Sequence, residues 1–185
     1  GRYFSLMEAA LPTEFDRDLR TLGECDFGGR LDGPFTAHPK VDPVSGDMVF
    51  FGYSATAPFL RYHEVDASGA LVHSADIELP AGVMMHDFSI TERYAVFFDS
   101  PAVFDLDALL QGEPPMSWRP DNGTRIGVMP RRGTSSDIRW FEIDNCYVVH
   151  FSNAWDRDGT IEIRAPRMPD MPGGFEAEPG PAREP

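Results

Sequence analysis

The sequence predicts an all-β protein built from many short strands. Aromatic residues make up 12% of the 185 residues, and aromatic side chains favour sheets. Seventeen glycines and 17 prolines interrupt the chain every few residues, which favours short strands joined by turns over long helices. One stretch, residues 105–118, could form a helical turn, and Pro114 and Pro115 would end it.

The strands are expected in pairs along the chain. The sequence DASG at 66–69 separates two alternating runs, which is typical of a β-hairpin. Residues 11–19 are expected to form a bend, and the Pro- and Gly-rich residues 166–185 are expected to form a loop. The expected strands are 2–9, 48–54 (reached from 33–40 through a turn), 59–65, 70–79, 82–90, 94–101, 124–130, 138–155 and 160–166.

The net charge of −14 bears on the choice of partners. An acidic surface repels phosphate backbones, so nucleic acid is not an expected partner, and simple electrostatic binding to anionic lipid is disfavoured as well. Two cysteines, Cys25 and Cys146, do not make a disulfide framework, so a reducing, cytoplasmic location is expected. No apolar run approaches the ~20 residues of a membrane span.

Three single histidines recur in a similar local pattern. His38, His86 and His150 each close an expected strand before a bend into the next one, with gaps of 48 and 64 residues. A blade of a β-propeller takes roughly 40–50 residues, with insertions in its loops. Because the innermost strands of successive blades run beside one central axis, equivalent positions at their ends face each other. The sequence therefore predicts a β-propeller in which these histidines converge, and Glu8 holds the same place in a fourth segment.

A convergent histidine cluster has a characteristic chemistry. Neutral imidazoles bind zinc, copper, iron and nickel. A histidine-only ligand set with open positions suits Fe(II) that accepts O2, or zinc that holds water. Metal-bound imidazoles usually donate their second N–H to a carboxylate, and Glu8 is the candidate for that role. The alternative is a set of ordinary buried histidines that are satisfied by hydrogen bonds.

Several longer motifs resemble the carotenoid cleavage oxygenases, also called the retinal pigment epithelial membrane protein family. They are "FTAHPKVDPVSGDMVFFGYS" (35–54), "MMHDFSITERYAVFFDSP" (84–101) and "CYVVHFSNAWDRDG" (146–159). Residues 1–23 and 125–133 are also similar to that family, and several of these motifs occur in the family's order. The resemblance covers residues 1 to about 165.

The resemblance implies a fold and an activity. Members of the family are seven-bladed β-propellers with a helical cap, in which four histidines bind non-haem Fe(II) and glutamates hold three of them. They use O2 to split a C=C bond of a carotenoid, apocarotenoid or stilbene into two carbonyl products. By this resemblance His38, His86 and His150 are three iron ligands, and Glu8 holds one of them.

The resemblance also implies that the chain is an internal piece. The family's fourth histidine and its other glutamates have no counterpart here. Residues 1–185 are therefore interpreted as part of a propeller domain with several consecutive blades, and 166–185 as the loop toward the next blade. Because an unclosed propeller exposes sheet edges, the piece alone is expected to be a poor catalyst.

The expected partners are O2 and an apolar polyene or stilbene, and peripheral contact with a membrane is left open. Phe88, Phe151 and Trp155 lie close in sequence to the histidines and are candidates for the wall of a substrate tunnel, with ordinary core packing as the alternative. Two other functions are retained. One is cleavage of phenolic stilbenes, and the other is a non-catalytic propeller scaffold without a metal.

Other polar residues are given no functional role. His63 and His73 are expected to form a surface pair across the DASG hairpin. The turn around Arg131 and Arg132 is expected to face solvent. Cys146 is expected in a strand, and Asp156 in a turn where it matters little. The adjacent His86 and Asp87 are similar to pairs in metal phosphohydrolases, but those lie on helices, so Asp87 is assigned no role.

Overall fold

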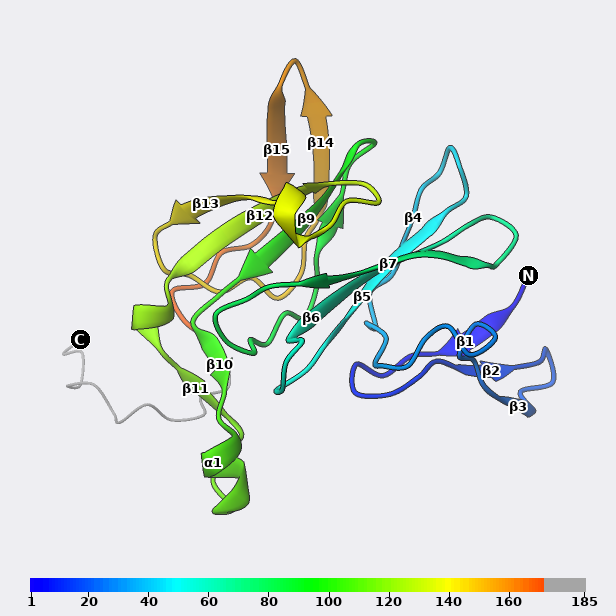
Figure 1. Ribbon diagram of the computed structural model, residues 1–185, viewed down its shortest axis with the longest axis horizontal. Coiled ribbons are helices and arrows are strands. Elements are labelled where there is room, and N and C mark those ends of the chain that lie inside the picture. The colour runs from blue at the N-terminus through cyan, green and yellow to red at the C-terminus, as the bar shows by residue number, and fades with distance from the viewer. Residues whose placement is uncertain (172–185) are drawn as a thin grey trace, which may run out of the picture.

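The computed structural model describes residues 1–171, and these residues form an almost entirely β structure (Figure 1). Their named strands fall into five sheets, all with antiparallel pairing. The predicted all-β fold with short strands is confirmed.

Two four-stranded antiparallel sheets form the centre of the molecule, and each runs as a meander in the manner of a propeller blade. In each sheet a two-residue strand lies at one edge and longer strands follow outward. The first blade is β4 (Lys40–Val41), β5 (Met48–Tyr53), β6 (Leu60–Val65) and β7 (Leu71–Ile77). The second blade is β8 (Ser89–Ile90), β9 (Tyr94–Asp99), β12 (Thr124–Pro130) and β13 (Arg139–Ile143).

The second blade carries an insertion between β9 and β12. It is a ribbon of β10 (Ala102–Phe104) and β11 (Met116–Trp118), with the helix α1 (Leu106–Leu110) at its tip (Figure 1). This insertion explains why the second histidine gap is 64 residues and the first is 48. No helix among residues 1–171 is long and apolar enough to cross a membrane.

Smaller sheets flank the two blades. A three-stranded sheet contains β1 (Tyr3–Ser5), β2 (Thr13–Phe15) and β3 (Thr21–Glu24). The expectation of a bend over 11–19 is therefore wrong, because β2 lies there and pairs with both of its neighbours. At the other end β14 (Asn153–Arg157) and β15 (Thr160–Arg164) form a hairpin that projects from the body (Figure 1).

The hairpin predicted at DASG is confirmed as the turn between β6 and β7. Asp66 Oδ1 accepts hydrogen bonds from the backbone N–H of Ser68 at 2.9 Å and of Ala70 at 3.1 Å. Gly69 has φ of 89°, which only glycine adopts without strain. The local sequence alone therefore specifies this turn.

Two long predicted strands are broken in the structure. Within 82–90 only Ser89–Ile90 joins the blade, because Met84 N–H donates to the Ala102 carbonyl at 2.8 Å and draws this segment toward β10 instead. Within 138–155, β13 and β14 are separated by an irregular stretch. Cys146 lies in that stretch and not in a strand, and both Cys25 and Cys146 are free and buried.

The loop predicted over 166–185 has pairing in its first part. The Met168 N–H donates to the Tyr147 carbonyl at 2.9 Å, and the Tyr147 N–H donates to the Met168 carbonyl at 2.8 Å. This bridge returns the chain to the stretch between β13 and β14. Residues 172–185 lie outside the described residues.

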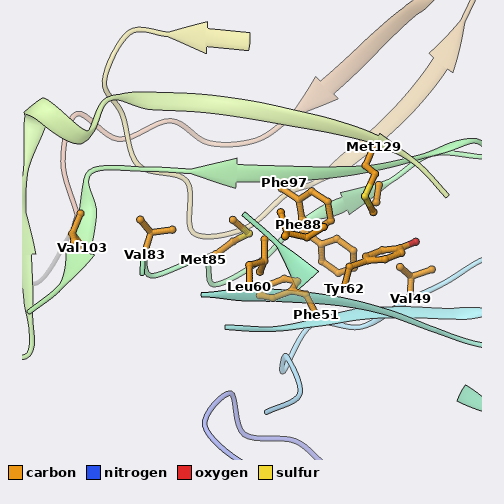
Figure 2. Packing of buried hydrophobic residues seen from close by; sticks show 12 residues of the cluster. Val49, Phe51, Leu60, Tyr62, Val83, Met85, Phe88, Phe97, Val103 and Met129 are labelled. Carbon is orange, nitrogen blue, oxygen red and sulfur yellow. The ribbon is translucent and has the colours of Figure 1, made fainter. Parts of the chain in front are cut away.

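The main core lies between the two blades (Figure 2). Phe51 and Tyr62 of the first blade face Phe88, just before β8, and Phe97 of the second blade, and all four side chains are completely buried. Their rings meet edge-on, with centroids 5.1 Å apart for Phe51 and Phe88, and 5.8 Å apart for Tyr62 and Phe97. Each such side chain contributes about 1.5–3 kcal/mol by leaving water. This packing sets the distance between neighbouring blades.

A buried ion cluster also joins the blades, and it corrects the prediction for the basic turn. Arg131, just after β12, is only 13% exposed and does not face solvent. Its Nε atom lies 2.8 Å from Oε1 of Glu64 in β6, a carboxylate that is 1% exposed. Arg132, which is 54% exposed, reaches Glu64 Oε2 at 3.2 Å. The turn is basic because it neutralises a buried acid of the preceding blade.

The predicted surface pair of histidines is wrong. His63 pairs in register with Ser74 and not with His73, so the two histidines lie on opposite faces of the β6–β7 hairpin. His63 is 3% exposed, and its Nδ1 lies 2.8 Å from Ser74 Oγ. His73 Nε2 lies 2.9 Å from the Gly133 carbonyl. Successive side chains of a strand point to opposite faces of the sheet, and the register of β6 with β7 therefore separates the two histidines.

Candidate metal centre

The structure brings His38, His86 and His150 together. Each lies in an irregular segment two or three residues before a short strand, and these strands are β4, β8 and β14 respectively. The inner ends of three successive sheets therefore each present one imidazole to the same point. We call these three residues the histidine cluster.

The histidine cluster is tight. Nε2 of His38 and Nε2 of His86 are 2.9 Å apart, and one ligand nitrogen from each of the three rings lies within 4.8 Å of the others. The ring centroid of His150 lies 4.8 Å from that of His38 and 4.9 Å from that of His86, and the rings meet edge-on. His38 and His86 are half-buried, whereas His150 is exposed, so the cluster can be reached from the side of His150.

Glu8 lies behind His86. Its Oε1 is 2.7 Å from His86 Nδ1, the ring nitrogen that does not face His38. The Tyr53 hydroxyl donates to Glu8 Oε2 at 3.0 Å. Glu8 sits in the turn after β1, so an acid from the flanking sheet orients an imidazole before the second blade. The carboxylate thus contacts Tyr53 with one oxygen and His86 with the other, and the contact with Nδ1 restrains the direction of the ring.

The surroundings of the site shift several pKa values. Burial lowers the pKa of His38; Asp87 opposes this shift, and the two other imidazoles and Lys40 add to it. The neutral imidazole is the form that binds a metal. Burial also raises the pKa of Tyr147 to about 12, and the nearby Glu8 adds to that shift. Burial raises the pKa of Tyr53 as well, so Tyr53 is a neutral donor to Glu8, whereas the Tyr147 hydroxyl donates to the Met84 carbonyl at 3.4 Å.

The donor set fits a transition-metal ion. Three imidazole nitrogens converge, and one of the rings has a carboxylate on its far nitrogen, the arrangement common to metal-bound histidines. An ordinary set of buried histidines would have its ring nitrogens satisfied separately, as those of His63 and His73 are. Here two Nε2 atoms point at each other instead.

The three predicted tunnel residues lie in different surroundings. Phe88 is completely buried in the core between the blades. Phe151 is half-buried and lines an open hollow of about 710 Å³ that runs along β4, β8 and β14. Trp155 lies in β14 with the Arg164 guanidinium 4.8 Å from its ring centre. Contact of these residues with a substrate stays a prediction.

Two acids have roles that sequence reasoning missed. Asp156 lies in β14 and not in a turn, and Arg93 binds it with Nε at 2.6 Å, which ties the second blade to the next hairpin. Asp87 is buried beside the histidine cluster and accepts hydrogen bonds from two segments. The adjacency of Asp87 to His86 was the available signal, but its partners come from distant parts of the sequence.

Comparison with known families decides where this site belongs. The family model described as retinal pigment epithelial membrane protein matches residues 1–183. The chain belongs to this family. Among curated relatives, carotenoid 9,10(9',10')-cleavage dioxygenase 1 of Arabidopsis thaliana is 40% identical over 179 residues, which are 92% of this chain and 33% of that protein. Isoeugenol monooxygenase of Pseudomonas nitroreducens is 40% identical over 168 residues, 88% of this chain and 35% of that protein.

Solved structures of the family confirm the predicted propeller-type fold. The lignostilbene dioxygenase of Pseudomonas brassicacearum matches with a TM-score of 0.82 and 38% identity, over 88% of this chain and 35% of that one. A cobalt-substituted Synechocystis apocarotenoid oxygenase matches with a TM-score of 0.81 and 27% identity, over 92% of this chain and 38% of that one. The chain thus spans about a third of the length of the relatives it matches.

Proposed function

We propose that this chain carries three ligands of a non-haem Fe(II) site in an enzyme that uses O2 to cleave a C=C bond of a carotenoid or apocarotenoid. The convergence of the histidine cluster, with Glu8 on the far nitrogen of His86, carries the proposal. Membership in the family and relatives that are named carotenoid cleavage dioxygenases support the reaction class.

The roles of the residues follow from their contacts. His38, His86 and His150 would hold the ion through nitrogen and leave further positions open. When bound, Fe(II) supplies the site at which O2 is activated beside the double bond. Glu8 Oε1, 2.7 Å from His86 Nδ1, would hold the N–H tautomer of that nitrogen and so keep Nε2 free as the ligand atom. No side-chain acid or base is needed for the cleavage, and the cluster holds only imidazoles.

A second candidate substrate class has its own support. The isoeugenol monooxygenase is as similar to this chain as the carotenoid dioxygenase is, and the lignostilbene dioxygenase has the same fold over most of this chain. A phenolic compound with a conjugated C=C bond is therefore the alternative to a polyene. Assaying an apocarotenoid and a stilbene side by side would choose between them through the carbonyl products that form.

The scaffold alternative predicts that no metal binds. The decisive measurement is the iron content of the chain after anaerobic Fe(II) reconstitution, compared with His86→Ala and with His73→Ala, which removes a histidine outside the cluster. We expect about one Fe(II) per chain for the wild type and for His73→Ala, and loss of the ion from His86→Ala. Equal iron in all three chains, or none in the wild type, would contradict the proposed site.

A further inference from the structure

A single buried carboxylate lies directly beside the histidine cluster. The Asp87 side chain is 2% exposed, and its Oδ1 lies 2.6 Å from Nζ of Lys40. The same oxygen accepts the backbone N–H of Phe88 at 2.8 Å. The other oxygen, Oδ2, accepts the backbone N–H of Phe151 at 2.9 Å. Both oxygens of Asp87 are therefore engaged.

The partners of Asp87 belong to all three segments that carry the histidine cluster. Lys40 lies two residues after the first histidine of the cluster, Asp87 directly follows the second, and Phe151 directly follows the third. One side chain thus contacts the chain just beyond each imidazole. Glu8, by contrast, contacts one ring of the cluster.

These segments need such a connection because they lie outside regular strands. The three histidines precede β4, β8 and β14, so no ladder of backbone hydrogen bonds fixes the positions of their segments relative to one another. Pro39 has a fixed φ and stiffens the link between the first histidine and Lys40. The Phe151 N–H belongs to the peptide group that follows the third histidine, so its bond to Asp87 restrains that residue's backbone directly.

The contacts around Asp87 require a carboxylate at this position. A buried carboxylate is costly unless it is paired and hydrogen-bonded, and Lys40 with the two N–H groups supplies that compensation. An amide in its place would present an NH2 group to at least one of these donors. The packed geometry therefore requires an acceptor at both positions.

We propose that Asp87 is a positioning residue for the metal site. Its carboxylate holds the three histidine-bearing segments at the spacing at which their imidazoles meet. The role toward a bound ion rests on the proposed function, whereas the role in bringing the imidazoles together is a property of the metal-free chain. The two parts can therefore be tested separately.

The first test uses the metal-free chain and the NMR signals of its imidazole Cε1–H groups, assigned by single His→Gln substitutions. In Asp87→Asn we expect the signals of all three residues of the histidine cluster to move, while those of His63 and His73 stay in place. The matched control is Asp99→Asn. Asp99 is 1% exposed and pairs with Arg125 at 2.7 Å in the second blade. This control should leave the cluster's signals unchanged.

A second variant serves if Asp87→Asn does not fold. Lys40→Gln keeps the Asp87 carboxylate and its bond to Phe151, so it should loosen the His38 segment alone. We expect the His38 signal to move most and the His150 signal least. Movement of all five histidine signals together, or of none, in the folded variant would overturn the proposal.

The second test titrates Fe(II) anaerobically into the same chains. We expect Asp87→Asn to bind Fe(II) about 10–100-fold more weakly than the wild type at the same stoichiometry, as for other residues that orient metal ligands. Asp99→Asn should bind as the wild type does even where its melting temperature falls. Wild-type affinity in Asp87→Asn, or equal weakening in both variants, would overturn the positioning role.

The two tests distinguish a failure of the proposed function from a failure of the positioning role of Asp87. If no chain binds Fe(II) and Asp87→Asn still moves the three cluster signals selectively, the proposed function fails and the positioning of the imidazoles stands. If the wild type binds Fe(II) and Asp87→Asn changes neither the signals nor the affinity, the proposed function stands and the role of Asp87 fails.

Discussion

Glu8 Oε1 lies 2.7 Å from Nδ1 of His86, and this contact joins the turn after β1 to the segment before β8. The other oxygen of Glu8 accepts the Tyr53 hydroxyl at 3.0 Å, from the end of β5. Three separate parts of the chain therefore meet at one carboxylate. The imidazole of His86 is oriented by residues that are distant from it in sequence.

Replacing Glu8 should weaken metal binding more than it weakens the fold. In Glu8→Gln one of the two oxygens becomes an NH2 group. The side chain can then no longer present an acceptor to both Tyr53 and His86. We expect Fe(II) affinity to fall about 10–100-fold in an anaerobic titration. Glu14→Gln, which breaks the exposed pair with Arg2, is the matched control and should bind as the wild type does. Unchanged affinity in Glu8→Gln would show that Glu8 does not orient the ring.

The ion cluster between the blades should make Arg131 important for stability. Arg131→Met leaves the Glu64 carboxylate buried without its main partner, and breaking a buried pair in this way costs about 3–5 kcal/mol. Arg132→Met is the control, since that side chain is 54% exposed and should cost about 1 kcal/mol or less. Urea unfolding of the two variants measures the difference. Equal losses would mean that Arg131 is no more important than Arg132 for neutralising Glu64.

His63 should make the chain less stable as the pH falls. Burial lowers its pKa from about 6.5 to about 4, and the charge of Arg61 adds to the shift. Because the unfolded chain takes up a proton at a higher pH than the folded chain does, the free energy of unfolding falls below pH 6.5 and levels off below pH 4. This shift corresponds to roughly 3 kcal/mol.

The measurement is urea unfolding of the wild type and His63→Gln at several pH values in this window. The variant has no titrating group at this position, so its free energy of unfolding should fall less between pH 6.5 and 4. Parallel pH profiles would show that His63 does not remain neutral in the folded chain.

Adding a side chain at Gly52 should destabilise the fold. A Cβ atom at this position would lie 2.2 Å from the carbonyl oxygen of Pro34, a backbone atom that cannot rotate away. The segment after Pro34 leads to His38 and is held to β5 by the bond from Thr36 N–H to the Phe51 carbonyl at 2.8 Å. Gly52→Ala should cost about 1–3 kcal/mol through overpacking.

The control for Gly52→Ala is Gly33→Ala, because a Cβ at Gly33 meets no atom within 4 Å. That variant should unfold within about 0.5 kcal/mol of the wild type. Thermal unfolding of both chains makes the comparison. A Gly52→Ala chain as stable as Gly33→Ala would mean that the 34–36 segment can shift away from β5.

The sequence by itself was sufficient for the local features of this protein. Alternating runs around DASG predict the β6–β7 hairpin because the turn is specified by residues within it, namely Asp66 and Gly69. The recurrence of one histidine per blade-length segment predicts their convergence because a propeller repeats one geometry around an axis.

Tertiary structure alone decided which distant polar groups meet. Nothing local in the sequence indicates that Lys40 and Phe151 both contact Asp87, or that Arg131 neutralises Glu64. The strands predicted over 82–90 and 138–155 are broken for the same reason, since their backbone groups find partners in other segments. A sequence pattern shows how polar and apolar residues alternate within one helix or strand. Which buried charge finds which partner depends on how the blades pack, and that is fixed only when the whole core forms.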